Sequence, residues 1–256
     1  MTEKTKVKVL EEVVVRLSGD SGDGMQLAGN IFSNVSAGIG DEISTFPDYP
    51  AEIRAPQGTL GGVSGFQVHI GKGVHTPGDL ADVLVAMNPA ALKTNARYVK
   101  KGGVVIIDSD SFRTSDLEKS AFTTDDPIQE AGLSHAQIVP VAITQMVKDS
   151  LADSGLDNKS IVRCKNMFAL GLVCWLFDRP LEQAQHLLKN KFAKKPAIYE
   201  ANAKVMRDGY NYGNNIHASV STYRVESAQV KPGIYTDVNG NTATAWGLIA
   251  ASEKSG

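Results

Sequence analysis

The sequence predicts an α/β domain with three layers (α/β/α), in which helices cover both faces of a Rossmann-like sheet that is mostly parallel or mixed. Short apolar runs typical of buried strands alternate with longer stretches of helical periodicity. A Gly-rich loop joins the first of these strands to the first helix. This alternation favours a layered sheet, because each helix packs its apolar side on the strands.

The individual elements follow in order along the chain. Strands are predicted at residues 13–17, 66–70, 83–87, 104–107 and 138–141, and helices at residues 25–39, 89–99, 143–152, 165–177, 181–190 and 196–210. The strand at 66–70 is expected to be exposed on one face, because its apolar residues alternate with Gln67 and His69. No helix is evident before this strand, which favours a mixed sheet.

The composition argues against a nucleic-acid-binding or membrane protein. With 26 Lys+Arg against 28 Asp+Glu, the net charge of −2 gives no electrostatic case for binding nucleic acid or an anionic membrane. No run of about 18 apolar residues occurs, and the residues after Met1 lack the apolar segment of a signal peptide. A cytoplasmic protein is therefore expected.

The cysteines and histidines predict no metal site on this chain. Cys164 and Cys174 lie ten residues apart in one helical segment, so their side chains point away from each other and a disulfide is not expected. Two cysteines cannot supply the four thiolates that an iron–sulfur cluster usually takes. The 5 histidines lie in separate segments and form no metal-binding or nucleophilic pattern. If electrons pass through such a cluster, another chain must carry it.

The 256 residues allow either one large domain with an extension or two domains. We place the α/β domain at residues 7–211 and a linker at residues 212–235, where polar and small residues surround Pro232-Gly233. Residues 236–256 are interpreted as the truncated start of a second domain, with a helix at 239–252 that has nothing to pack on.

The Gly-rich loop is the run Gly19-Asp20-Ser21-Gly22-Asp23-Gly24. Free backbone N–H groups and the helix dipole at such a strand-to-helix junction favour a phosphate or another anion. The alternative is a tight turn in which Asp20 or Asp23 caps the helix.

A dinucleotide fingerprint is a poor match to this loop, because Ser21 replaces the second glycine of Gly-x-Gly-x-x-Gly. Asp41 and Glu42 nevertheless lie about 20 residues further on, where that fingerprint has its ribose-binding acid. A nicotinamide-binding domain is therefore kept as an alternative.

Separated motifs along the chain resemble one known family. They are the runs Gly19 to Met25, Tyr49 to Pro56, Lys165 to Gly171, and Thr236 to Ala245. The first three resemble the gamma domain of the 2-oxoacid:ferredoxin oxidoreductases, and the fourth resembles the opening of the family's alpha domain. Gamma before alpha in one chain is the arrangement of the large subunit of the 2-oxoglutarate and related 2-oxoacid enzymes.

The resemblance implies a coenzyme A site at the Gly-rich loop. Mapped by motif, its residues are Gly19, Ser21, Gly22, Asp23 and Gly24. Arg54 and Glu52 match the family's Glu-x-Arg, but Ala55-Pro56 stands where many members continue with Gly-Gly. Arg54 is a candidate to pair with a phosphate of coenzyme A through its guanidinium. The alternative is an internal ion pair with Glu52 or with an aspartate of the loop.

Two asparagines were weighed as further ligand groups. Asn88 follows the strand at 83–87, at the end where open α/β sheets bind ligands, although a cap for the following helix is the favoured explanation. Asn166 stands at the entry of an apolar helix, where packing is the simpler explanation. Lys194-Lys195 is most simply a solvated turn.

The resemblance implies oxidative decarboxylation of a 2-oxoacid, with 2-oxoglutarate favoured, to its acyl-coenzyme A. Thiamine diphosphate, Mg and an iron–sulfur cluster would belong to the complete enzyme, on the remainder of the alpha domain and a beta subunit, and ferredoxin would accept the electrons. The chain alone is expected to be inactive. The alternatives are the nicotinamide-binding dehydrogenase domain and a non-catalytic assembly domain.

Overall fold

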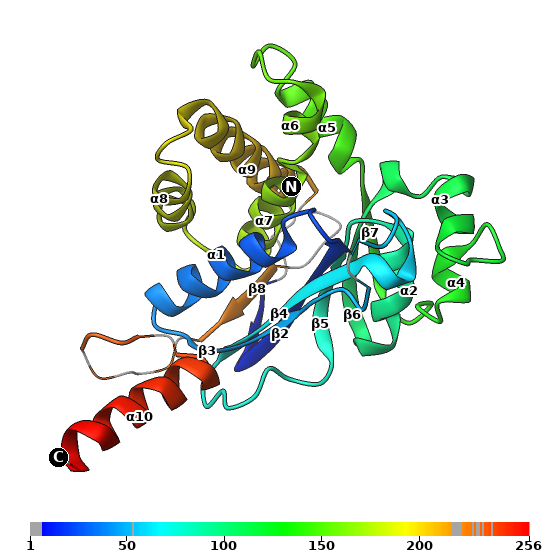
Figure 1. The fold of residues 1–256 in the computed structure, drawn as a ribbon. Coiled ribbons are helices and arrows are strands. Elements are labelled where there is room, and N and C mark those ends of the chain that lie inside the picture. The colour runs from blue at the N-terminus through cyan, green and yellow to red at the C-terminus, as the bar shows by residue number, and fades with distance from the viewer. Residues whose placement is uncertain are drawn as a thin grey trace.

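The computed structural model describes residues 7–52, 54–216, 222–226, 228, 231, 233–236 and 238–255. Within these residues a mixed six-stranded sheet has the order β3-β4-β2-β5-β6-β7 (Figure 1). The strands are β2 (Glu12–Asp20), β3 (Glu42–Asp48), β4 (Val63–Gly71), β5 (Ala81–Ala86), β6 (Val99–Asp108) and β7 (Gln137–Val141). β2, β5, β6 and β7 run parallel, whereas β4 is antiparallel to both β2 and β3.

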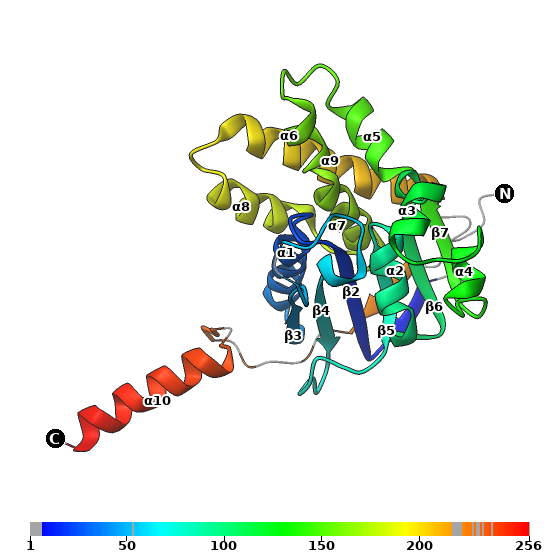
Figure 2. The same cartoon turned by 45° about the vertical axis from the view of Figure 1, so that its right-hand side comes forward.

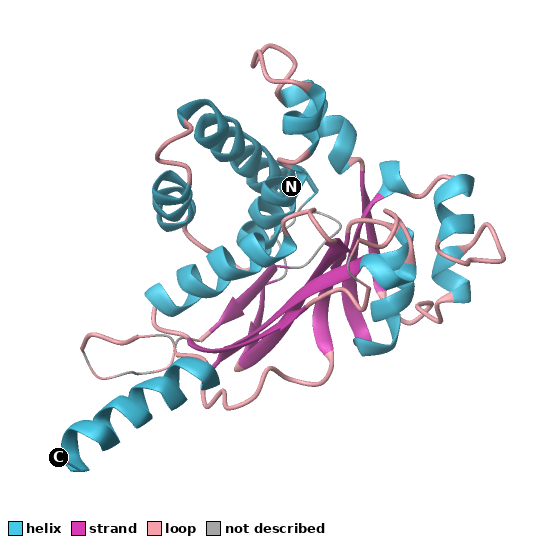
Figure 3. Cartoon of the chain, in the orientation of Figure 1, coloured by secondary structure: helices cyan, strands magenta, loops and turns pink. Residues whose placement is uncertain are grey.

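Helices cover the sheet in two groups, which Figure 3 shows on either side of the magenta strands. One core contains α1 (Met25–Gly38), α5 (Ile143–Ser150), α7 (Lys165–Leu176), α8 (Leu181–Lys191) and α9 (Pro196–Ile216). The other contains α2 (Pro89–Asn95), α3 (Thr114–Lys119) and α4 (Pro127–Glu130). α6 (Asn158–Val162) precedes α7. The predicted three-layer fold with a mixed sheet is therefore confirmed.

The strand predicted at 66–70 differs from expectation, because β4 is buried on both faces. Gln67 is 4% exposed and His69 is 7% exposed. The Gln67 amide donates to the carbonyls of Pro77 and Gly78 at 2.8 and 2.6 Å, and a ring nitrogen of His69 lies 2.6 Å from the Thr76 carbonyl. The loop before β5 thus covers the polar face of β4, where the sequence pattern indicated solvent.

Part of the segment expected as a linker is folded. α9 continues to Ile216, and β8 (Thr222–Val225) pairs in parallel with β1 (Val7–Leu10). Tyr223 of β8 stacks on Phe177 at 5.5 Å between ring centroids, so burial of this strand extends the first core. Residues 217–221, 227, 229, 230 and 232 of the expected linker lie outside the described residues.

The helix predicted near 239–252 is present as α10 (Gly240–Ser255). None of its described residues is buried, and Figure 2 shows it projecting from the rest of the chain. Both cysteines are free and buried, as expected. Among the residues described, no helix has both the length and the apolar character needed to cross a membrane.

Two glycines allow α7 and α9 to cross closely. A Cβ on Gly209 would lie 2.1 Å from the Phe168 carbonyl oxygen, and one on Gly171 would lie 2.0 Å from that of Met206. We expect Gly209→Ala to cost about 2 to 3 kcal/mol, because backbone must move apart in a packed core. Thermal unfolding would show this as a fall in Tm of about 4 to 12 °C.

Gly38→Ala is the matched control for this prediction. A Cβ there meets only the end of the flexible Gln183 side chain, so we expect a change within about 1 kcal/mol. Equal Tm values for the two variants would contradict the close crossing of α7 and α9.

Candidate functional site

The Gly-rich loop lies at the carboxyl end of β2, beside the end of β5. The amide of Met87 donates to the Ser18 carbonyl at 2.9 Å, which joins the two strand ends. From here α1 leads to one face of the sheet and α2 to the other (Figure 2). Such a divergence is a topological switch point, where open α/β sheets bind ligands.

The segment that follows β3 is hydrogen-bonded to the Gly-rich loop. The carboxylate of Asp20 accepts a hydrogen bond from the Gly58 amide at 3.1 Å. The amide of Ser21 donates to the Gly62 carbonyl at 2.9 Å. The second sequence motif, at residues 49–56, therefore leads directly into a segment that packs on the first.

The third motif reaches the same loop from the start of α7. Lys165 Nζ lies 3.3 Å from Asp23 Oδ1, and both side chains are largely buried. Asn166 Nδ2 donates to the Gly24 carbonyl at 3.2 Å. The structure thus brings the first and third motifs into contact and packs the segment that follows the second motif on the same loop.

The N-terminus of α1 has no side-chain cap. Asp23 instead closes the loop on itself, because its carboxylate accepts from the Asp20 amide at 3.0 Å. Gly24 has φ +77° and Gly22 has φ +109°, conformations that glycine adopts readily. A Cβ on Gly22 would meet nothing within 4 Å. The expected cap by Asp20 or Asp23 is therefore wrong, and the first turn of α1 presents its backbone N–H groups without a capping side chain.

A pocket of about 370 Å³ opens beside this loop. Gly22 and Leu27 line it together with residues of α6, α7, α9 and the turns between these helices, which are Ser160, Arg163, Cys164, Asn166, Phe192, Lys195, Ile198 and Asn202. Its volume lies in the usual range for small-molecule sites. Asn166 is 4% exposed, and its Oδ1 has no hydrogen-bond partner among the described residues. A buried amide oxygen left unpaired costs free energy.

The charges around the loop are separated. Burial raises the pKa of Asp20, and the neighbouring Asp23 raises that pKa further. Burial also raises the pKa of Asp108 at the end of β6, although Thr144 bonds its carboxylate. Arg163 and Lys195 stand on the opposite side, where they are exposed at the pocket. An anion would therefore approach from the pocket side.

Two other residues that the sequence suggested as ligand groups are Arg54 and Asn88. Arg54 is exposed with φ +66°, and it forms no ion pair with Glu52 or the loop aspartates in the part of the chain that is described. Asn88 accepts from the Ala91 amide at 2.8 Å and caps α2, while its side chain also bonds Asp20. The cap interpretation of Asn88 is thus confirmed.

The acids weighed for a nicotinamide ribose are already occupied. Asp41 Oδ2 lies 2.7 Å from Arg179 Nη2, and the Asp41 side chain is 0% exposed. Glu42 accepts from the amides of Gly73 and Val74 at 2.6 and 2.9 Å. Neither carboxylate is free to bind a ribose in this arrangement.

Arg163, Lys195 and Asn202 are site residues that the sequence interpretation missed. Lys195 was expected to be a solvated turn, and Arg163 and Asn202 matched no motif. They gather only because α6, α7 and α9 converge on Gly22. The one sequence signal was the Lys165-Asn166 pair, which begins the third motif directly after Arg163 and Cys164.

The fold and this site define an α/β domain that presents an uncapped helix N-terminus and a polar pocket at its topological switch point. The sequence pattern of the family described as pyruvate ferredoxin/flavodoxin oxidoreductase matches residues 14–212. The chain belongs to this family.

Similar proteins extend the comparison. Over 248 residues, 96% of this chain, it is 45% identical to the 2-oxoglutarate oxidoreductase subunit KorA of Mycobacterium tuberculosis, of which it spans 38%. The 2-oxoglutarate:ferredoxin oxidoreductase of Magnetococcus marinus aligns with a TM-score of 0.66 and 23% identity over 86% of this chain and 34% of that one. The gamma subunit of a keto/oxoacid ferredoxin oxidoreductase from Geobacter sulfurreducens aligns with a TM-score of 0.56 and 24% identity, over 79% of this chain and 99% of that one. Both structures support the fold.

Proposed function

We propose that this chain supplies the coenzyme A-handling domain of an enzyme that oxidatively decarboxylates 2-oxoglutarate and passes the electrons to ferredoxin. The observation that carries the proposal is that the first and third motifs, and the segment that follows the second, meet at the uncapped N-terminus of α1. The choice of 2-oxoglutarate follows the name of the Mycobacterium tuberculosis relative. Coenzyme A and 2-oxoglutarate are also named as ligands of the Magnetococcus marinus structure.

The pocket has the chemistry that the nucleotide end of coenzyme A requires. Backbone N–H groups at Gly22 to Leu27 suit phosphate oxygens, which the helix dipole also favours. Arg163 and Lys195 add two positive charges at the rim. Asn166 and Asn202 add side-chain amides to the pocket lining, which can donate and accept hydrogen bonds. Phe192, Leu27 and Ile198 supply apolar wall.

Thiamine diphosphate, its Mg ion and the iron–sulfur clusters are proposed to lie on other parts of the complete enzyme. Burial raises the pKa of the Cys164 thiol to about 11 and that of the Cys174 thiol to about 12. Cluster ligands are thiolates, so these two thiols do not fit that role. The coenzyme would accept the acyl group that the thiamine cofactor releases from the 2-oxoacid.

The domain organisation is part of the proposal. The first domain takes the coenzyme, and residues 236–256 begin an alpha domain of the thiamine enzyme. Trp246, Leu248 and Ile249 of α10 are 52%, 68% and 58% exposed, which suits a helix that packs on further structure. A beta subunit with the thiamine and cluster sites, and ferredoxin, complete the assembly.

Calorimetric titration of this chain with coenzyme A and with NAD tests the proposal. We expect saturable binding of coenzyme A and none of NAD. Arg163→Ala, Lys195→Ala and Arg54→Ala should each weaken coenzyme A binding by roughly 3- to 10-fold, because each removes one solvent-screened charge-assisted contact.

Lys189→Ala is the control for these variants, since Lys189 is also exposed and lies on α8 outside the pocket lining. It should leave the affinity unchanged. NAD binding would favour the dehydrogenase alternative, and binding of neither ligand would favour an assembly domain.

A further inference from the structure

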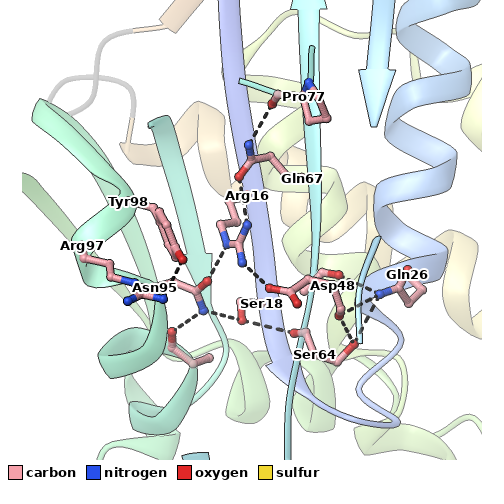
Figure 4. Close-up of polar contacts among 12 residues, drawn as sticks. Arg16, Ser18, Gln26, Asp48, Ser64, Gln67, Pro77, Asn95, Arg97 and Tyr98 are labelled. Carbon is pink, nitrogen blue, oxygen red and sulfur yellow. Dashed lines mark hydrogen bonds and ion pairs between the residues drawn. The ribbon is translucent and has the colours of Figure 1, made fainter. Parts of the chain in front are cut away.

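Arg16 is a buried cation in the middle of the sheet, on the face opposite α1. It is 6% exposed and lies across from Gln67 in the β2–β4 register. Its guanidinium donates to Asn95 Oδ1, to Gln67 Oε1 at 3.0 Å and to Asp48 Oδ2 (Figure 4). The ring of Tyr98 lies 5.0 Å from the guanidinium carbon.

A charged residue here is not explained by stability alone. Removing a guanidinium from water costs several kcal/mol, and a well-packed apolar side chain is often as stable or more so. The neighbouring position on the same face of β2 has an apolar residue, Val14, which is 3% exposed. The presence of a charged residue at this buried position therefore needs an explanation other than stability.

The partners of Arg16 lead to the edges of the candidate site. Asp48 is the last residue of β3 and precedes the motif at 49–56. Asn95 Nδ2 donates to Ser18 Oγ at 2.9 Å, and Ser18 precedes Gly19. Ser18 Oγ in turn donates to the Ser64 carbonyl at 3.2 Å.

A last side chain closes these contacts into a ring. Gln26, in the first turn of α1, donates to the Asp48 carbonyl at 3.3 Å and to the Gly65 carbonyl at 2.7 Å. The Ser64 hydroxyl donates to the same Asp48 carbonyl at 3.2 Å. Figure 4 shows this ring joining three strands to α1. The ends of β2 and β3 and the start of α1 are thereby held in one arrangement.

We propose that Arg16 is a positioning residue for the coenzyme site, which holds the Gly-rich loop and the segment at 49–62 in register without touching the ligand. This proposal rests on the proposed function. Through Asp48 it fixes where the Glu52–Arg54 segment leaves the sheet, and through Asn95 and Ser18 it fixes where the Gly-rich loop begins.

The test compares Arg16→Met, Arg16→Lys and Asp48→Asn in the complete enzyme. Arg16→Met should raise KM for coenzyme A about 10-fold or more, because it breaks a charge-assisted contact that the site geometry depends on. Arg16→Lys keeps the positive charge but lacks the planar, forked guanidinium, so its KM for coenzyme A should lie between those of the wild type and Arg16→Met. The rate of cluster reduction by 2-oxoglutarate without coenzyme A should stay near that of the wild type. If Arg16→Met does not fold, the KM values of Arg16→Lys and Asp48→Asn still test the proposal.

Amide hydrogen exchange supplies a second readout that does not need the coenzyme. The amides of Ser21 and Gly58 should exchange faster in the Arg16 variants, since they donate across the two segments, to the Gly62 carbonyl and the Asp20 carboxylate. His69→Gln is the control: His69 lies on the same face, next after Gln67 on that face of β4, and contacts Glu12 and Thr76 rather than the ring. It should change neither KM nor these amides.

An unchanged KM for coenzyme A in all three variants would overturn the proposal, as would an equal rise in the His69→Gln control. If the wild-type enzyme shows no dependence on coenzyme A, the proposed function fails instead. In that case the exchange rates of the Ser21 and Gly58 amides alone decide whether Arg16 holds the two segments together.

Discussion

Asp41→Ala is expected to destabilise the protein by about 3 to 5 kcal/mol, because it leaves a buried guanidinium without its counter-charge. Asp41 stands between α1 and β3, and Arg179 stands between α7 and α8. Their side chains are 0% and 3% exposed, with 2.7 Å between Oδ2 and Nη2. Urea unfolding at neutral pH, followed by circular dichroism, would measure the loss.

The double variant Asp41→Leu with Arg179→Met is the matched control. Burial raises the pKa of Asp41 to about 6 in spite of Arg179, and burial lowers the pKa of Arg179. Desolvation therefore outweighs the attraction in both residues, so an apolar pair of similar volume should recover most of the stability. A double variant as unstable as Asp41→Ala would show that the pair itself stabilises the fold.

The same pair predicts the direction of a pH dependence. The pKa of Asp41 is raised in the folded protein above its ordinary value of 3.8, so the folded state holds this proton more tightly. The contribution of Asp41 to the free energy of unfolding is then largest at low pH and falls as pH rises from about 4 to about 6. The stability difference between wild type and double variant should shift in favour of the wild type as pH is lowered through this window. No shift would contradict the raised pKa.

Gly24→Ala is expected to weaken coenzyme A binding by roughly 30- to 1,000-fold, or about 2 to 4 kcal/mol. Two effects add at this residue. Its φ of +77° is unfavourable for any side chain with a Cβ, and that Cβ would lie 2.3 Å from Asn166 Nδ2. The substitution should therefore break the contact that brings α7 to the loop. Calorimetry with coenzyme A measures the affinity, and far-UV circular dichroism checks that the variant is folded.

Two companion variants separate the causes. Gly22→Ala has a similarly unfavourable φ of +109°, but its Cβ meets no protein atom within 4 Å. Its smaller loss therefore contains backbone strain and any contact of the methyl group with the ligand, but no clash inside the protein. Adding Asn166→Ala to Gly24→Ala removes the clash and should recover the packing part of the loss. If Gly24→Ala binds coenzyme A like the wild type, the loop does not form the coenzyme site.

Local pattern was enough for much of the fold. Continuous apolar runs predicted β2, β5 and β6, and apolar residues at helical spacing predicted α1, α7 and α9. These elements could be predicted because their own residue pattern determines which side chains are buried. β3 was missed, since it is a partly exposed edge strand that contains Pro47 and lacks a clear alternation. β8 was missed because its burial depends on Tyr223 stacking on Phe177, far away in the sequence.

The candidate site also has a part that the sequence predicted and a part that only the tertiary structure shows. By itself the sequence determined the position of the Gly-rich loop between a strand and a helix and the order of the motifs, because these depend on residue type and short spacing. Only the tertiary structure decided that Asn166 bonds Gly24, a contact across 142 residues. It also decided that Arg163 and Lys195 share a pocket with Gly22. The reason is physical: which polar groups meet, and which stay unpaired, depends on how the helices pack, and packing is a property of distant segments that no local pattern records.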